Sequence, residues 1–253
     1  MGAVADKVIA GLGTAEEAWL PWLAAQPLRP ASVADLLAED CRLVMVAPHP
    51  DDEVLAIGGL LAHWSTLRAD VLIVAVTDGE GSHAGSAQWP PVRLAAERPL
   101  ESAEAWRRLG FGQPTCERLG LPDGGVRPHR EALIGSIAAL LRPDDVVFTT
   151  WRHDGHPDHE ATGRACAVAC AQVGSTLVEV PVWAWHWAEP GDARLPWHRA
   201  LRLPLDASSA ARKRHAVGAF TSQLRPDPST GAGPILRSTT VQRAHRPFEI
   251  FFA

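Results

Sequence analysis

Tyrosine is absent from the 253 residues of this chain, and no run of eighteen apolar residues occurs in it. Without such a run the sequence predicts no membrane span. The amino terminus also lacks the basic region and following apolar stretch that are typical of a secretory signal. Lysine and arginine together number 24 against 29 acidic residues, which gives a formal net charge of −5. This balance offers no basic face for nucleic acid, so we expect no such partner.

Cysteine is scarce as well, with four residues scattered along the chain. They do not form the dense disulfide framework of small secreted proteins. Cys166 and Cys170 lie four apart in a helical pattern, and this spacing favours apolar packing over metal binding. We therefore expect a reduced, cytoplasmic protein.

The residues that are present are organised around the segment 48–53, Pro-His-Pro-Asp-Asp-Glu. It follows an apolar run, 43–47, that is typical of a strand buried on both faces. Three neighbouring carboxylates repel one another unless positive charge lies among them. A divalent cation would supply that charge, and His49 adds a nitrogen ligand beside the oxygens. The alternative is that the three acids only cap the helix that follows.

A second cluster, His-Asp-Gly-His-Pro-Asp-His-Glu at 153–160, has the same form. It follows a strand-like run at 145–150 and precedes a helical pattern at 161–173. His156 and His159 lie three apart around a helix start, so both can turn toward one point. Such segments place both clusters at the carboxyl ends of parallel strands, where open α/β sheets bind ligands. Solvated loop histidines are the alternative, but the equivalent positions of the two clusters favour one shared metal site.

Strand-like runs and helical patterns follow one another along the chain, which predicts a Rossmann-like α/β fold. In this fold a mostly parallel sheet is flanked by helices on both faces, with the active site at the carboxyl ends of the strands. We expect strands at 43–47, 70–76, 115–119, 145–150, 176–183, 201–205 and 248–252, and helices at 15–25, 54–67, 94–109, 130–141, 161–173 and 208–219. Pro181 and Pro204 indicate edge positions for their strands. Residues 1–253 are expected to form one domain, in which 1–40 are a helical extension without assigned chemistry.

The two motifs together resemble the signature of the LmbE/PIG-L family of zinc-dependent de-N-acetylases. That family includes deacetylases of mycothiol and bacillithiol synthesis and of N-acetylglucosaminyl-phosphatidylinositol. The likeness covers about residues 41–225. Lesser landmarks agree with it: Thr77-Asp78-Gly79-Glu80, Arg98 and Glu101 ahead of Leu109-Gly110, Leu121-Pro122-Asp123, and Ser222-Gln223. The resemblance implies hydrolysis of an N-acyl amide on a small-molecule substrate, with an N-acetylated amino sugar or glycoconjugate as the first expectation.

The resemblance also implies a metal centre made of His49, Asp52 and His159. Two histidines and one carboxylate keep a position open for water, as catalytic zinc sites do. Zinc is the expected metal, and iron(II) suits this ligand set too. A metal-dependent phosphoesterase is an alternative, although it would be expected to hold a second metal. A catalytically silent metal-binding module is another, but it would have no need of Asp51 and His156.

Three further residues are expected to take part in catalysis. Asp51 would be the general base for the zinc-activated water, and His156 would stabilise the oxyanion. Asp158 would hydrogen-bond a histidine and fix its tautomer. Some members of the family place a tyrosine just before the second motif, where this chain has Asp154. The duty of that tyrosine then passes to Arg152, to His156 alone or to the metal.

Glu80, Arg98 and Asp123 are the residues expected to contact the substrate. Glu80 lies among glycines after the second strand, where a merely solvated acid is the alternative. Arg98 resembles the family arginine that meets the substrate, and a surface ion pair with Glu101 or Glu104 is the alternative. Asp123 resembles the family acid that binds sugar hydroxyls, and the opening residue of a turn is the alternative.

Tryptophan is abundant, with ten residues. Trp185, Trp187 and Trp197 could form a sugar-stacking wall at the mouth of the cleft, but ordinary core and rim packing is favoured. Residues 84–92 are expected to form a flap over the cleft. The identity of the acyl substrate is left open by these patterns, and an oligomer is possible.

Overall fold

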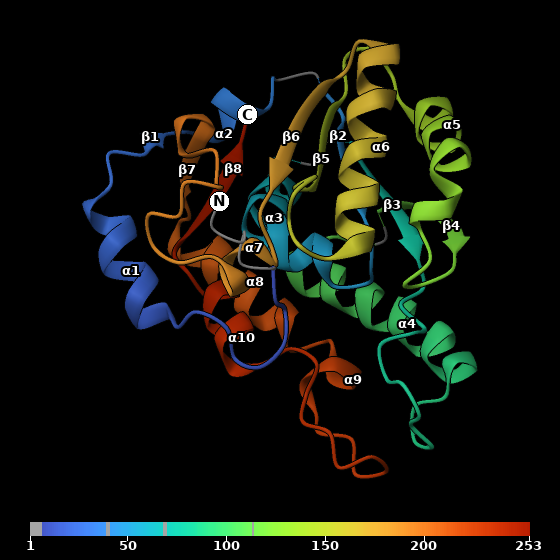
Figure 1. The fold of residues 1–253 in the computed structure, drawn as a ribbon. Coiled ribbons are helices and arrows are strands. Elements are labelled where there is room, and N and C mark those ends of the chain that lie inside the picture. Colours follow the sequence, from blue (N-terminus) through green and yellow to red (C-terminus); the bar gives the residue numbers. More distant parts are fainter. Residues whose placement is uncertain (1–6, 39–40, 68–69, 113) are drawn as a thin grey trace, which may run out of the picture.

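The computed structural model describes residues 7–38, 41–67, 70–112 and 114–253. Within them one eight-stranded sheet has the order β1-β7-β8-β6-β5-β2-β3-β4 (Figure 1). The strands are β1 (Arg29–Pro30), β2 (Leu43–Ala47), β3 (Val71–Thr77), β4 (Thr115–Leu121), β5 (Val146–Thr150), β6 (Thr176–Val180), β7 (Ala200–Pro204) and β8 (Phe248–Phe252). The run from β6 through β5, β2 and β3 to β4 is parallel, whereas β8 is antiparallel to both β6 and β7. The predicted Rossmann-like, mostly parallel sheet is confirmed.

Helices cover both faces of this sheet (Figure 1). They are α1 (Glu16–Ala25), α2 (Val33–Leu36), α3 (Asp52–Trp64), α4 (Pro91–Leu109), α5 (Arg130–Leu140), α6 (Pro157–Val173), α7 (Ala184–Trp187), α8 (Ala207–Val217), α9 (Thr221–Leu224) and α10 (Ser238–Ala244). Helices α5 and α6 lie on one face, and α3, α4 and α8 lie on the other. No helix of the described ranges has both the length and the apolar character needed to cross a bilayer.

The central strand β2 fixes where the first motif begins. Its five residues are all buried, because successive side chains enter opposite cores. Leu43 and Met45 pack in the core with α3 and α8, while Val44 and Val46 pack in the core with α5 and α6. Each such buried side chain stabilises the fold by about 1.5–3 kcal/mol. The carboxyl end of β2 is therefore held firmly between two layers of helices.

The predicted packing of Cys166 and Cys170 is confirmed, since both are buried in the core between the sheet and α6. The edge position inferred from Pro181 is wrong, because β6 lies between β5 and β8. Pro181 follows the last residue of β6, so its missing N–H leaves the ladder intact. The edge position inferred from Pro204 is wrong for its strand too, because β7 lies between β1 and β8. Pro204 ends β7, beyond the two residues of that strand that pair with β1.

The N-terminal extension reaches the main body through its first described residues, 7–14. The N–H of Thr14 donates to the carbonyl of His186 at 2.9 Å. Lys7 Nζ donates to Glu160 Oε1 at 2.7 Å, close to the second motif. Residues 1–6 and 39–40 of the predicted extension lie outside the described residues. The extension therefore combines the predicted helices with a segment that runs along the edge of the second motif.

Candidate metal centre and its cavity

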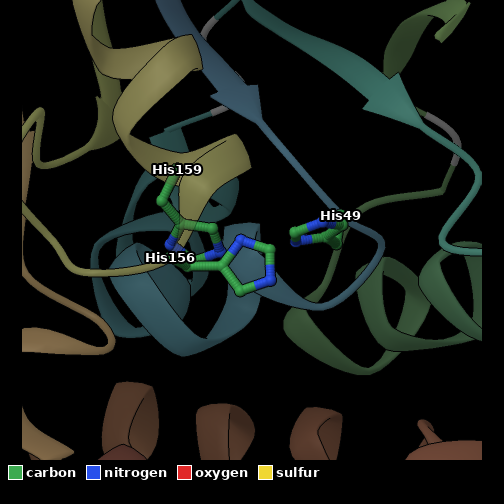
Figure 2. A group of neighbouring side chains, drawn as sticks. All are labelled: His49, His156 and His159. Atoms are coloured by element: carbon green, nitrogen blue, oxygen red, sulfur yellow. The ribbon is translucent and has the colours of Figure 1, made fainter. Parts of the chain in front are cut away.

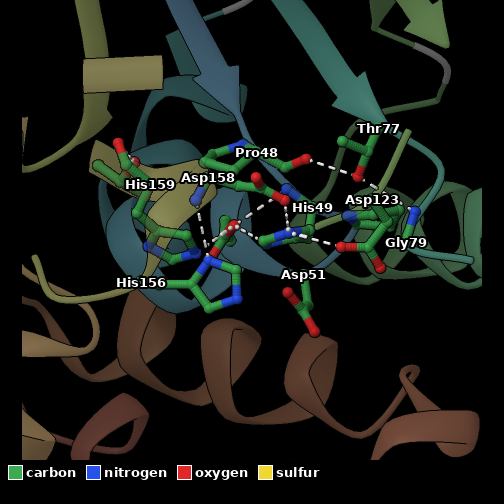
Figure 3. Close-up of polar contacts among 12 residues, drawn as sticks. Pro48, His49, Asp51, Thr77, Gly79, Asp123, His156, Asp158 and His159 are labelled. Carbon is green, nitrogen blue, oxygen red and sulfur yellow. Dashed lines mark hydrogen bonds and ion pairs between the residues drawn. The ribbon is translucent and has the colours of Figure 1, made fainter. Parts of the chain in front are cut away.

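The first motif is tied to the neighbouring strand as soon as β2 ends. Thr77, the last residue of β3, donates its N–H and its hydroxyl to the carbonyl of Pro48, at 3.1 and 2.8 Å (Figure 3). Asp52 begins α3, and its Oδ2 accepts the N–H of His49 at 3.0 Å. These bonds fix the short crossing from strand to helix. His49 and Asp52 therefore face the same side of the sheet edge.

Asp51 has a backbone conformation that L-residues rarely adopt. It is the only non-glycine residue of the described chain with positive φ, 128° with ψ −30°. Such outliers cost about 1–3 kcal/mol and cluster at functional sites, where the surrounding contacts maintain them. The N–H of Asp51 donates to Glu53 Oε2 at 3.0 Å, and its own Oδ2 accepts from Arg98 at 3.0 Å. Its side chain makes no capping bond to α3, so the capping alternative is wrong for Asp51.

The second motif places His159 in the first turn of α6. Asp154 Oδ2 lies 2.8 Å from His159 Nδ1, and both side chains are fully buried. Asp154 also accepts the N–H groups of Val182, Trp183 and Ala184, each at 2.9 Å. This carboxylate therefore fixes the ring of His159 and the turn after β6 together. A carboxylate on one ring nitrogen leaves the other nitrogen free to bind a metal.

Asp52 lies between the two histidines. Its Oδ2 is 3.3 Å from His49 Nδ1 and 3.2 Å from His159 Nε2. Ligand atoms on a tetrahedral zinc ion with bonds of about 2.0–2.2 Å are separated by roughly 3.3–3.6 Å. The Nε2 atom of His159 is buried and has no hydrogen-bond partner among the described residues. The donor types and these two separations therefore suit zinc, and Nε2 of His159, whose 3.2 Å approach to Asp52 is not a hydrogen bond, is the buried polar atom that a cation would satisfy.

The rings of His49, His156 and His159 gather at one point (Figure 2). Ligand atoms of these three residues lie within 4.8 Å of one another, and so do those of His49, Asp123 and Asp158. The two nitrogens of His49 have different neighbours, because Nε2 lies 3.1 Å from Asp123 and 3.3 Å from Asp158, whereas Nδ1 lies 3.3 Å from Asp52. Asp158 Oδ2 also accepts the N–H of the glycine at 124. Asp158 thus orients His49 from the side opposite Asp52.

The carboxylates attract positive charge to the histidines. Burial would lower the pKa of His49, but hydrogen bonds to Asp123, Asp158 and Asp52 raise it well above its usual value. Burial would lower the pKa of His159 too, and the charge of Asp52 helps raise it to about 9. The site therefore favours a positive charge, as protons or as a cation.

The pKa values of the two catalytic candidates, Asp51 and His156, are shifted in opposite directions. Burial raises the pKa of Asp51 to about 7, against the opposing charge of Arg98. Burial, together with the neighbouring charge of His159, lowers the pKa of His156 to about 3, so this ring is neutral. The Nδ1 atom of His156 accepts the N–H of Asp158 at 3.2 Å. The ring proton is therefore left on Nε2, which can act as a donor.

Arg98 is buried, and the alternative of a surface ion pair is wrong. Its guanidinium donates to Asp51 Oδ2 and to the carbonyls of Pro50, at 2.6 Å, and Gly79, at 2.8 Å. Glu101 and Glu104 have other partners in Ser222 and Arg107. Arg98 therefore holds the general-base candidate in place.

Asp123 and Glu80 are joined by a hydrogen bond. Glu80 Oε1 accepts the N–H of Asp123 at 2.9 Å, and Asp123 Oδ2 accepts the N–H of Gly81 at 2.9 Å. Asp123 and Arg98 line a cavity of about 330 Å³ whose lining also includes His49, Asp51, Asp52, His156 and His159. Glu80 is not among the described lining residues. The predicted substrate contacts stay predictions, and Glu80 contacts the backbone of Asp123.

A break in α3 lies about one turn beyond the motif. Ile57 has φ −129° and ψ 20°, outside the helical range. Glu249 of β8 accepts the N–H groups of Gly59 and Leu60 at 2.7 and 3.0 Å. Lys213 of α8 donates to the carbonyl of Leu55 at 3.0 Å and to Glu249 at 2.6 Å, and this ion pair is buried. The pair satisfies the backbone groups that the break exposes, and so supports the turns that begin at Asp52.

Sequence reasoning missed several residues around the site. Asp154 was noted only as a replacement for tyrosine, and the roles of Glu53 and Lys213 carried no sequence signal. Trp185 packs edge-to-face on Trp19, with ring centroids 5.0 Å apart, which agrees with the favoured prediction of ordinary core packing. The tryptophan that lines the cavity is Trp183. Its ring lies nearly parallel to that of His156, at a centroid distance of 6.3 Å.

A Rossmann-like sheet with histidines and aspartates converging at the carboxyl ends of its strands defines an α/β protein with a candidate metal centre. The chain belongs to the GlcNAc-PI de-N-acetylase (PIG-L) family, whose model matches residues 44–170. The resemblance seen in the two motifs is thereby confirmed.

Individual relatives support this placement. The 1D-myo-inositol 2-acetamido-2-deoxy-alpha-D-glucopyranoside deacetylase of Mycolicibacterium gilvum is 30% identical over 171 residues, 58% of this chain and 59% of that protein. The chain thus spans less than two thirds of the length of this curated relative. A conserved protein from Thermus thermophilus is 26% identical with a TM-score of 0.58, over 83% of this chain and 93% of that one. A deacetylase of teicoplanin biosynthesis, 20% identical, shares the fold with a TM-score of 0.62, over 83% and 96%.

Proposed function

We propose that this chain hydrolyses an N-acyl amide, and that its substrate is a small N-acetylated amino sugar or glycoconjugate. The observation that carries this proposal is the position of Asp52, within 3.3 Å of a nitrogen on His49 and on His159, beside a buried Asp51. The family and the named activity of the M. gilvum relative support the same reaction. His49, Asp52 and His159 would hold a single zinc ion.

Zinc, when bound, polarises a carbonyl oxygen and lowers the pKa of water. Asp51 accepts the proton of the attacking water, and its pKa of about 7 suits a base that works at neutral pH. Arg98 keeps the carboxylate of Asp51 aimed into the cavity. His156 offers the Nε2 proton to the developing oxyanion, because its Nδ1 already accepts the N–H of Asp158.

Two aspartates orient the histidine ligands. Asp158 bonds Nε2 of His49, and Asp154 bonds Nδ1 of His159. Of the three candidates for the duty of the missing tyrosine, Arg152 is engaged elsewhere, because its Nε donates to Glu179 at 2.7 Å. His156 and the metal are therefore the groups left to stabilise the oxyanion.

The test is to incubate the zinc-loaded protein with a panel of N-acetylated amino sugars and to look by mass spectrometry for products that have lost acetyl. The expected result is release of acetate with one metal ion per chain. Two metal ions per chain, with cleavage of phosphate esters, would favour a phosphoesterase instead. Zinc binding without release of any acid would favour a silent binding module. Activity restored by iron(II) alone would keep the reaction but change the metal.

A further inference from the structure

The wall of the catalytic cavity comes from two separate parts of the chain. Every predicted metal ligand and catalytic residue lies inside the family-matched segment, 44–170. The lining also includes five apolar residues from outside that segment: Ile9, Val182, Trp183, Ile235 and Leu236. We call these five residues the apolar wall. The family match therefore accounts for the reacting groups but not for these apolar residues.

The apolar wall is built into the fold. The carbonyl of Ala10, next to Ile9, accepts from the ring of His186 at 3.0 Å. The N–H of Leu236 donates to the carbonyl of Gln223 at 3.0 Å. The N–H of Trp183 donates to buried Asp154. Ile9, Ile235 and Trp183 are each only half-buried, so they keep apolar surface that a ligand can cover.

Polar groups lie elsewhere in the same cavity. Ser82, Asp123 and Gln223 line it, and Gln223 Oε1 is buried without a hydrogen-bond partner among the described residues. A buried acceptor of this kind is costly unless a donor reaches it. A sugar hydroxyl is such a donor. The cavity thus has an apolar wall and a separate set of hydrogen-bonding groups.

The charges of the cavity disfavour an anionic ligand. Among the described lining residues Arg98 is the only lysine or arginine, and its guanidinium already serves Asp51 and two carbonyls. Asp51, Asp52 and Asp123 add carboxylates to the lining. A bound zinc ion adds two positive charges, and together with Arg98 these only balance the three carboxylates, so a phosphate or carboxylate on the substrate would meet no net positive charge.

From this division we infer that the substrate is a neutral, amphiphilic N-acyl amino sugar with an apolar substituent that packs on Ile9, Trp183 and Ile235. This inference rests on the proposed function and names the substrate class within it. The substituent can sit on the glycosidic oxygen or form the tail of the acyl group, since both place alkyl carbons beside the amide.

The test compares matched ligands. They are methyl N-acetylglucosaminide, its hexyl analogue, the N-hexanoyl analogue of the methyl glycoside, and N-acetylglucosamine 1-phosphate. Binding is measured by calorimetry on zinc-loaded Asp51→Asn protein, in which the ligands stay intact, and kcat/KM is measured on the wild-type protein. We expect one of the two hexyl-bearing ligands to bind roughly tenfold more tightly than the methyl glycoside. The phosphate should bind more weakly than the methyl glycoside.

Ile9→Ser and Ile235→Ser should each reduce the ratio of hexyl to methyl affinity. Val8→Ser is the matched control, because Val8 is 58% exposed and does not line the cavity, and it should leave that ratio unchanged. Equal binding of the methyl and both hexyl ligands, or preference for the phosphate, would overturn the inference. Failure of the wild-type protein to release acid from any ligand would overturn the proposed function, and it would be seen separately from the binding results.

Discussion

The family-matched segment, 44–170, and the residues that flank it contribute to one cavity in different ways. The matched segment supplies charged and titratable groups whose spacing is short, such as His49 with Asp52 and His156 with His159. The flanks supply apolar side chains that reach the cavity only through long-range packing, such as Ile9 and Ile235. The proposed reaction thus depends on residues that form local motifs. Our inference assigns the choice of substrate to residues with no motif of their own.

The largest expected effect is on the chemistry of the matched segment. Asp51→Asn should reduce kcat by about 10²–10⁴-fold, because it removes the general base. Zinc affinity should be retained, since Asn keeps the shape of Asp and tolerates positive φ. Steady-state kinetics and metal analysis check this prediction. Asp144→Asn, at an exposed position before β5, is the control and should be silent. Unchanged kcat in Asp51→Asn would remove Asp51 from the mechanism.

A second prediction asks whether the flanks only shape the cavity or also support the metal centre. Lys213→Met should lower the free energy of unfolding by about 3–5 kcal/mol, because Glu249 is left buried without its partner. Zinc affinity should also fall, since the break in α3 loses support below Asp52. Denaturant unfolding and zinc titration measure the two effects.

The buried pair between Arg246 and Glu16 provides the control for that experiment, because it is equally buried and makes no hydrogen bond to α3. Arg246→Met should destabilise the protein while leaving zinc affinity unchanged once the protein is folded. Equal zinc affinities in the two variants would show that the pair between Lys213 and Glu249 stabilises the fold but does not support the metal centre.

Asp154→Asn should weaken zinc binding by about 10–100-fold, because His159 loses the carboxylate that fixes its tautomer. Competition with a chelator of known affinity measures the zinc dissociation constant of each protein. Asp78→Asn removes only a partly exposed ion pair with Arg118 and should not change zinc affinity. If Asp154→Asn binds zinc as the wild type does, the buried carboxylate serves only the turn at Trp183.

The smallest expected effect concerns Glu80, and it tests whether this residue contacts the substrate or only holds Asp123 in place. Glu80→Gln keeps an oxygen that can accept the N–H of Asp123, so kcat/KM should change by less than about fivefold. A larger loss, expressed in KM, would show that Glu80 touches the substrate directly. Kinetics at several substrate concentrations separate these outcomes.

Seven of the eight strands and the two motifs were predictable because each is a local pattern, whereas the two-residue strand β1 was not predicted. Strand β2 was predicted at its observed bounds, since five apolar residues before a polar cluster leave one reasonable interpretation. The short helix α10 was not predicted, because its seven residues show no distinct apolar period. The break at Ile57 was missed as well. It depends on Glu249 and Lys213, which lie more than 150 residues away in the chain.

The geometry within the site depended on contacts that no spacing reveals. The positive φ of Asp51 exists because Glu53 and Arg98 hold its backbone and side chain. The role of Asp154 depends on its burial beneath the turn after β6. Local motifs therefore predicted which residues meet, and tertiary packing decided how they are oriented.

The central claim is that two distant motifs bind one ion through Nδ1 of His49, Oδ2 of Asp52 and Nε2 of His159. An anomalous difference map at the zinc edge, from a crystal of the zinc-loaded protein, tests it most directly. The account predicts one peak within bonding distance of those three atoms. A peak at Nε2 of His49 between Asp123 and Asp158, or no peak in the cavity, would contradict it.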